Sequence, residues 1–230
     1  MTPPTALVTG ASRGIGRAIA LRLAPEYHIV AAARSAAELD SLAAQIGDAR
    51  GTCTPVVLDV ADGAAVARAL ADVQADVVVN NAGVGIIKPL LELTPEEWHR
   101  QVDVNFNALY HVTRAVLPGM VSRGRGHVVI VGSIAGRSAF VGGTAYTGTK
   151  HAVMAFAESL LLEVRDQGVK VSVVSPGGVD TGFGGSKAGG PTWKIDAEDV
   201  AEAVAGVLNT PPNVLVHRVE IRALSKNLSH

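Results

Sequence analysis

The sequence predicts a doubly wound α/β fold, in which helices cover both faces of one parallel sheet of about seven strands. Short apolar runs alternate with helical segments along all 230 residues, and no linker or low-complexity stretch divides them. Hydrophobic residues make up 48% of the chain but aromatic residues only 4%, which is typical of aliphatic strands buried on both faces. We therefore expect a single domain over residues 1–230.

The strands and helices can be assigned in order along the chain. The predicted strands lie at residues 5–9, 28–33, 54–58, 76–80, 127–132, 170–175 and 214–221. Four of the helices between them have recognisable N-terminal residues, which are Ser35, Asp62, Thr94 and Asp196. Ser35 and Thr94 are each followed by a glutamate three residues later, which is the capping-box spacing. Parallel strands joined in this way bind ligands beyond their carboxyl ends.

The first strand leads directly into a glycine-rich turn and a helix. The turn reads Gly10-Ala-Ser-Arg-Gly14-Ile-Gly16, and helical periodicity follows it. Without a Cβ, the backbone of such a turn can approach a pyrophosphate closely, and the helix presents free N–H groups to it. Three residues separate the first two glycines instead of the single residue of the standard dinucleotide fingerprint.

A tyrosine and a lysine near the middle of the chain are predicted to share one face of a helix. Tyr146 and Lys150 are four residues apart, and Ser133 follows the predicted strand at 127–132. A phenol, an ammonium and a hydroxyl held together can pass a proton to a carbonyl oxygen. Because free tyrosine has a pKa near ~10, reversible proton transfer near neutrality needs a neighbouring positive charge to stabilise the phenolate.

Six separated motifs share their order and spacing with one enzyme family. They are Thr9-Gly-x-x-x-Gly-x-Gly16, Asn80-Asn-Ala-Gly83, Asn105, Ser133, Tyr146-x-x-x-Lys150 and Pro176-Gly177. Together they resemble the short-chain dehydrogenase/reductase family over nearly the whole chain. The resemblance implies a Rossmann-type fold and an oxidoreductase that interconverts a carbonyl and a secondary alcohol by hydride transfer.

The same resemblance implies roles for individual residues. Tyr146 would be the acid/base, Ser133 would hydrogen-bond the substrate oxygen, and Lys150 would lower the tyrosine pKa and hold the nicotinamide ribose. Asn105 would hold a water that links Lys150 to solvent. The implied cofactor-binding residues are Gly10, Ser12, Arg13, Gly14, Ile15, Gly16, Arg34, Asp59, Val60, Asn81, Ala82, Gly83, Tyr146, Lys150, Pro176, Gly177, Val179 and Thr181.

The choice of cofactor depends on charge at the end of the second strand. An acidic residue there would bond the adenosine ribose and repel a 2′-phosphate. This strand ends in three alanines followed by Arg34, whose planar guanidinium suits a phosphate, and Arg13 could supply a second cation. The resemblance implies that this pairing of arginines favours NADP(H).

The substrate is less defined by the sequence. A glycine-rich segment at about residues 182–194, with Phe183 and Trp193 as bulky side chains, is predicted to form a substrate flap. Arg137 and Lys187 are either carboxylate or phosphate ligands, or a turn residue and a solvated lysine. A 3-oxoacyl-thioester reductase is an alternative function, as are a 3-hydroxy acid or sugar alcohol dehydrogenase and a non-catalytic NADP-binding regulator.

Composition restricts the partners and the location of the protein. A net charge of -1 gives no electrostatic basis for binding nucleic acid or an anionic membrane. The single cysteine, Cys53, excludes an internal disulfide, and the histidines have no metal-ligand grouping. We expect a cytoplasmic protein with a small-molecule substrate. The resemblance also implies a homodimer or homotetramer, paired through a face of the helix after Thr144 that includes Phe156 and Leu160.

Overall fold

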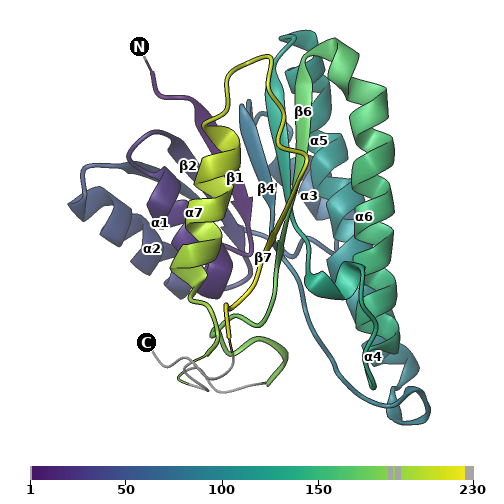
Figure 1. Ribbon diagram of the computed structural model, residues 1–230. Helices are drawn as coiled ribbons and strands as arrows, with labels where there is room; N and C mark the ends of the chain where they lie inside the picture. The colour runs from purple at the N-terminus through teal and green to yellow at the C-terminus, as the bar shows by residue number, and fades with distance from the viewer. Residues whose placement is uncertain (1, 186–188, 190–192, 226–230) are drawn as a thin grey trace.

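Seven parallel strands form one sheet in the computed structural model, which describes residues 2–185, 189 and 193–225 (Figure 1). The strands are β1 (Thr5–Thr9), β2 (His28–Ala33), β3 (Thr52–Val57), β4 (Val77–Asn80), β5 (Gly126–Val131), β6 (Val169–Pro176) and β7 (Arg218–Ile221). Their order in the sheet is β3-β2-β1-β4-β5-β6-β7. The order reverses between β1 and β4, and this switch point is where a doubly wound sheet opens a crevice for a ligand.

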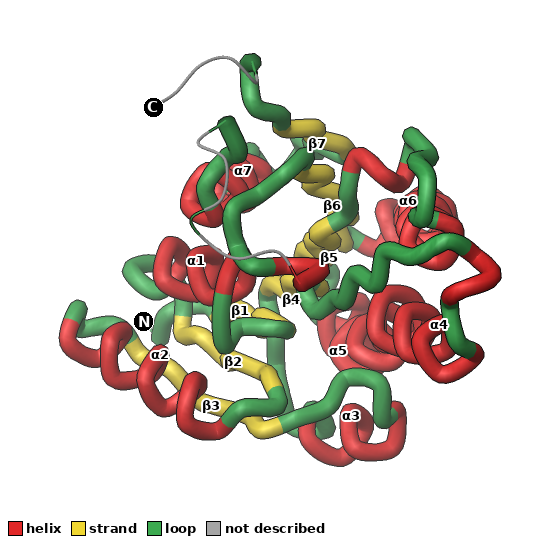
Figure 2. Tube along the Cα trace, turned by 90° about the horizontal axis from the view of Figure 1, so that it is seen from below, coloured by secondary structure: helices red, strands yellow, loops and turns green. Residues whose placement is uncertain are grey.

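Helices cover both faces of the sheet, as the sequence predicts (Figure 2). They are α1 (Gly14–Leu23), α2 (Ala36–Asp48), α3 (Gly63–Ala69), α4 (Pro95–Val102), α5 (Ala108–Ser122), α6 (Thr144–Val164) and α7 (Ala197–Leu208). Successive strand residues point to opposite faces. Val8 of β1 therefore packs in the cluster with α1, α2 and α7, whereas Leu7 packs in the cluster with α3, α5 and α6. The predicted doubly wound fold is confirmed.

The four predicted helix starts are found in the structure. The Ser35 hydroxyl accepts the Glu38 N–H at 3.4 Å, and the Asp62 carboxylate accepts the Ala65 N–H at 2.9 Å. Thr94 forms a complete capping box at the start of α4. The N–H of Asp196 donates to Asp199 at the start of α7. These caps satisfy N–H groups that have no partner inside the helix.

The last strand is shorter than predicted. Residues 214–221 were expected to be one strand, but β7 begins only at Arg218. The residues before it still run beside β6, where the Ser172 hydroxyl donates to the Val216 carbonyl at 2.6 Å and His217 contacts the Val171 carbonyl at 2.9 Å. One backbone bond, from the Val173 N–H to the His217 carbonyl at 2.8 Å, also joins this stretch to β6, so side chains supplement an incomplete backbone ladder. Apolar alternation alone does not distinguish this arrangement from a regular strand.

Two helices carry irregular turns that bear on the site. A π-helical turn, Asp103–Asn107, joins α4 to α5 without a break and contains Asn105. Helix α6 continues as a tight turn at residues 165–167 and ends at Gly168, whose φ of +78° lies in the left-handed region that favours glycine. Leu160 of α6 is 6% exposed and packs against the sheet, so its predicted place on an outer face is wrong.

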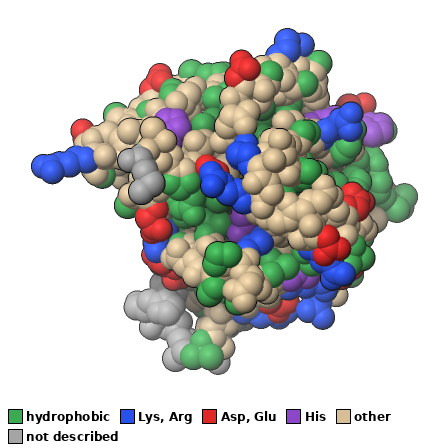
Figure 3. Space-filling model, turned by 90° about the horizontal axis from the view of Figure 1, so that it is seen from above, with side chains coloured by type: hydrophobic (Ala, Val, Ile, Leu, Met, Phe, Trp, Pro, Cys, Tyr) green, Lys and Arg blue, Asp and Glu red, His purple; other side chains and the backbone are tan. Residues whose placement is uncertain are grey.

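Among the described residues, no helix combines the length and hydropathy that a bilayer crossing requires. The edge of the sheet at the amino ends of the strands carries both acidic and basic side chains (Figure 3).

Candidate functional site

A cleft of about 940 Å³ follows the carboxyl ends of the strands. We call it the central cleft. All the predicted cofactor-binding residues line it except Gly16, and all the predicted catalytic residues line it except Asn105. Figure 2 shows this edge of the molecule, where loops from both halves of the sheet meet. A volume near the upper end of the usual ligand-site range is large enough for an extended ligand.

The switch point is fixed by polar contacts between the ends of β1 and β4. The Thr9 hydroxyl accepts the N–H groups of Asn81 and Ala82 at 3.0 and 3.1 Å. The Asn81 amide donates back to the Thr9 carbonyl at 2.9 Å. Gly10 has a φ of +66°, and a Cβ on Gly16 would lie 2.2 Å from the Gly10 carbonyl oxygen. Gly16 therefore allows α1 to pack on the turn, which explains why it lies behind the cleft wall.

Charged side chains gather at the end of the cleft near β2. Arg13, the residue before α1, and Arg34, the residue after β2, are both exposed and line the cleft together with Glu38. The Asp59 carboxylate accepts the N–H of Ala61 at 3.0 Å and pairs with Arg100 at 3.3 Å.

Arg100 is a cleft residue that the sequence analysis missed. It lies on α4, 41 positions along the chain from Asp59. No local pattern in the sequence links the two, so only the fold could identify the pair.

Ser133, Tyr146 and Lys150 meet at the other end of the cleft. Ser133 begins the turn after β5, and its hydroxyl accepts the Ala135 N–H at 3.1 Å. Tyr146 and Lys150 lie one turn apart on α6, and the Lys150 Nζ is 5.9 Å from the centroid of the tyrosine ring. Lys150 is buried, and its Nζ donates to the Val131 carbonyl at 3.0 Å.

Burial favours the neutral forms of both titratable groups. Burial raises the pKa of the Tyr146 phenol, and a hydrogen bond with Ser133 partly offsets this effect. Burial also lowers the pKa of Lys150 to about 8. The protein without cofactor therefore presents a protonated phenol, the form that can donate a proton. Acting as a base would require an additional positive charge beside the ring.

Asn105 does not line the cleft itself but holds the chain after β4. Its carbonyl oxygen accepts the Val84 N–H at 2.8 Å, and its amide donates to the Val84 carbonyl and the Thr149 hydroxyl at 2.9 and 3.1 Å. Thr149 precedes Lys150, so the amide ties the substrate side of the cleft to the catalytic helix. A small cavity of about 10 Å³, the size of one water, lies between Asn105 and Lys150.

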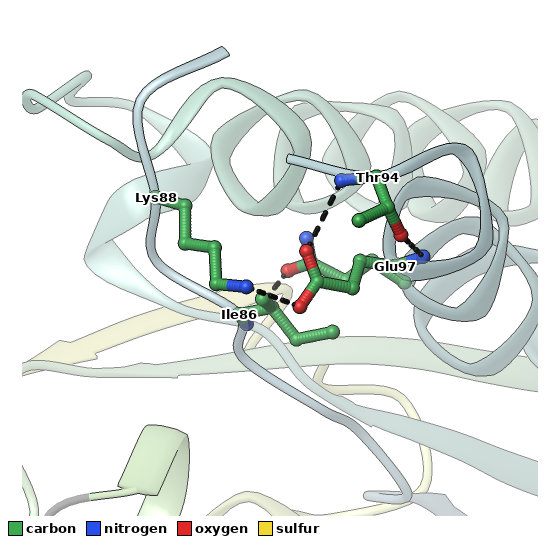
Figure 4. Close-up of polar contacts among 5 residues, drawn as sticks. Ile86, Lys88, Thr94 and Glu97 are labelled. Carbon is green, nitrogen blue, oxygen red and sulfur yellow. Dashed lines mark hydrogen bonds and ion pairs between the residues drawn. The ribbon is translucent and has the colours of Figure 1, made fainter. Parts of the chain in front are cut away.

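A second amide supports the same segment one helical turn earlier. The side-chain carbonyl of Gln101 accepts the Ile86 N–H at 3.0 Å, and Gln101 is fully buried. Lys88 forms an ion pair with Glu97, whose other oxygen accepts the Thr94 N–H (Figure 4). Alternate residues of the segment are thus held at 84, 86 and 88. The sequence analysis did not identify Gln101 or this anchoring.

The base of the predicted flap is closed by the chain on either side of it. Val179 and Ile195 form a parallel bridge, and the Asp180 N–H donates to the Ile195 carbonyl at 3.0 Å. Phe183 lines the cleft. Arg137 is exposed and is not part of the cleft wall, and Lys187 lies outside the described residues.

Within the parts of the chain that the structure describes, no group of three or more His, Cys, Asp or Glu side chains could hold a metal ion.

Known proteins are similar to this chain over most of its length. Residues 4–189 match the family described as short chain dehydrogenase. The NADP-dependent 3-hydroxy acid dehydrogenase YdfG of Salmonella typhi is 34% identical over 97% of this chain and 96% of its own. Human retinol dehydrogenase 8 is 37% identical over 80% of this chain and 61% of its own. An alcohol dehydrogenase structure from Thermococcus sibiricus, complexed with 5-hydroxy-NADP, superposes with a TM-score of 0.91 at 33% identity, covering 96% and 97% of the two chains.

Proposed function

Because the chain belongs to the short-chain dehydrogenase family, we propose that it interconverts a carbonyl and a secondary alcohol with Tyr146 as the acid/base. It is an NADP(H)-dependent oxidoreductase. The observation that carries the proposal is the layout of the central cleft. Two guanidinium groups line one end, and Ser133, Tyr146 and Lys150 line the other.

The residues of the cleft fit the cofactor. Arg13 and Arg34 offer exposed cations for the 2′-phosphate, and β2 ends in alanine, with no carboxylate to repel it. The backbone of the glycine turn and the start of α1 face the cleft where a pyrophosphate needs N–H donors. NADPH held by these residues would supply the hydride for the carbonyl carbon.

Side chains of the protein donate the proton and stabilise the phenolate that remains. Tyr146, kept protonated by burial, donates its phenolic proton to the carbonyl oxygen, while the Ser133 hydroxyl hydrogen-bonds the same oxygen. The Lys150 ammonium, 5.9 Å from the ring, stabilises the resulting phenolate. Asn105 keeps Val84 and Thr149 in place, and it would position a water in the small cavity beside Lys150.

The Tyr146→Phe variant tests the proposed acid/base. The ring still packs but has no ionisable proton, so turnover of a competent ketone should fall by ~10²–10⁴-fold while NADPH binding survives. Tyr110→Phe, at a half-exposed position on α5, is the matched control and should keep full activity. Unchanged turnover in Tyr146→Phe would show that the proton comes from water or another group. Activity in the parent protein would exclude a non-catalytic regulator.

The assembly and location of the protein are further parts of the proposal. We infer a cytoplasmic homodimer or homotetramer that pairs through the outer face of α6. Phe156 on that face packs edge-on against Phe106 at 6.4 Å between ring centroids, and Leu162 is 66% exposed. Light scattering at micromolar concentration should give a dimer or tetramer. A fully active monomer would contradict this inference.

A further inference from the structure

Two phenylalanine rings flank the proposed catalytic tyrosine. The centroid of the Tyr146 ring is 6.5 Å from that of Phe140 and 5.8 Å from that of Phe183, with interplanar angles of 59° and 56°. Phe140 precedes α6, whereas Phe183 follows β6, so two separate segments bring their rings to one phenol. Both rings remain 43–45% exposed. Tilted contacts at these distances are favourable arrangements of aromatic rings.

A glycine on the opposite segment leaves the space that the Phe183 ring occupies. A Cβ on Gly85 would lie 2.5 Å from the Phe183 ring, so this ring can occupy its place only because residue 85 has no side chain. Gly85 in turn lies between Val84 and Ile86, whose N–H groups are held by the Asn105 and Gln101 amides. The aromatic wall is therefore supported by hydrogen bonds to two buried amide side chains.

Further apolar side chains extend this wall at the surface. Ile87 is 45% exposed and Val141 is 94% exposed. The two segments that carry them are joined, because the Lys88 N–H donates to the Gly142 carbonyl at 3.0 Å. We call Ile87, Phe140, Val141 and Phe183 the apolar rim. Exposed apolar groups gathered beside a reacting group are typical of a ligand-binding surface.

One cation of the same segments is already paired. Lys88 is paired with Glu97, as Figure 4 shows. Arg137 is exposed and, like Ile87, Phe140 and Val141 of the rim, stands outside the cleft wall. Lys194 lines the cleft beside Gly178. Within the described parts of these segments, Arg137 and Lys194 are the cations left for a substrate carboxylate. An apolar substituent beside Tyr146 would meet Phe183 in the cleft wall and Phe140 next to the tyrosine ring.

We propose that the substrate is a neutral ketone, or the corresponding secondary alcohol, whose carbonyl carbon carries an aryl or bulky alkyl group packed on Phe140 and Phe183. This inference rests on the function proposed above. Reduction adds a hydride from NADPH to the carbonyl carbon and a proton from Tyr146 to the oxygen, and solvent then restores the phenolic proton. The products are the alcohol and NADP⁺.

A matched pair of ketones tests the substrate class. 4-Methylacetophenone and 4-acetylbenzoate have similar shapes but differ in one negative charge. We expect kcat/KM with NADPH to be at least ~tenfold higher for the neutral ketone, since removing apolar contacts or desolvating a charge changes specificity by this order. Oxidation of 3-hydroxybutanoate with NADP⁺ serves as the hydroxy acid comparison and should be slower than oxidation of 1-phenylethanol.

Variants of the apolar rim test whether its side chains bind the neutral ketone. Phe140→Ala and Phe183→Ala should each lower kcat/KM for 4-methylacetophenone by ~5–50-fold, mainly through KM, with the KM for NADPH unchanged. Val214→Ala is the control, because Val214 is similarly exposed, at 41%, at the opposite edge of the sheet.

Three outcomes would overturn the inference. A preference for 4-acetylbenzoate or 3-hydroxybutanoate that is lost in Arg137→Ala or Lys194→Ala would show a carboxylate site, and the proposed function would stand. Equal kcat/KM values for the two ketones would show that the rim does not select its substrate. If NADPH binds but none of the neutral or anionic probes reacts, the proposed function fails together with the inference.

Discussion

Replacing the buried lysine by methionine should make the protein more stable and inactive at the same time. Lys150 is 7% exposed, and burial lowers its pKa from 10.5 to about 8. Such a pKa means that charging this amine costs about 3 kcal/mol more in the folded protein than in the unfolded chain. Methionine has a similar length and no charge, so Lys150→Met removes this cost.

The gain in stability is reduced because the variant loses one hydrogen bond. The Lys150 Nζ donates to the Val131 carbonyl at 3.0 Å, and losing a hydrogen bond of this kind costs about 1 kcal/mol. The free energy of unfolding at pH 7 should therefore rise by about 2 kcal/mol, equivalent to a Tm increase of about 4–8 °C for a chain of this size. Thermal unfolding of the cofactor-free protein measures the change.

The pH dependence of the free energy of unfolding tests whether the buried amine of Lys150 causes the change in stability. Between about pH 8 and 10.5 the unfolded chain holds a proton on Lys150 that the folded protein has released, so the parent becomes more stable as pH rises through this window. The variant lacks this rise, and its advantage should disappear near pH 10.5. Lys170→Met is the control. Its Nζ bonds to Thr210 and Pro211, so this variant should lose stability at pH 7.

A loss of stability in Lys150→Met would contradict this reasoning. If Lys150→Met were less stable than the parent at pH 7, with a difference that did not change up to pH 10.5, the buried charge would be stabilised by its surroundings. In either case turnover should be lost, because the phenolate of Tyr146 would have no neighbouring cation. Cofactor should also raise the Tm of the variant less than that of the parent, because the ammonium would hold the nicotinamide ribose.

Two further variants test the cleft and its support. The parent should favour NADPH over NADH by at least ~tenfold in kcat/KM. The Arg34→Asp variant should raise the KM for NADPH most and leave the KM for NADH little affected or improved. Equal kcat/KM values of the parent with both cofactors would contradict this prediction. Gln101→Met should change the free energy of unfolding by less than about 1 kcal/mol, because the Ile86 N–H loses its acceptor while a buried amide donor without a partner is removed. Its KM for the ketone should nevertheless rise with the KM for NADPH unchanged, and an unaltered ketone KM would show that Gln101 does not position the segment.

Local patterns in the sequence determined most of the fold. Apolar runs, capping residues and the glycine turn depend on neighbours within a few positions, so the alternation of strands and helices and four helix starts could be predicted from them. The spacing of Tyr146 and Lys150 likewise placed both on one helix face. The last strand was the exception. It begins at Arg218 rather than at residue 214, and the side chains of Ser172 and His217 help to bond the stretch before it to β6.

Contacts between distant segments were decided only by the tertiary structure. Asp59 meets Arg100, Ile86 meets Gln101, and Tyr146 meets Phe183 across 41, 15 and 37 positions of the chain. No periodicity or spacing encodes these pairs, because each depends on how the loops after different strands converge at one edge of the sheet. The burial of individual side chains also depends on contacts between distant segments. The sequence shows a lysine beside a tyrosine, but only packing beneath the sheet edge lowers the pKa of Lys150 and keeps the phenol of Tyr146 protonated.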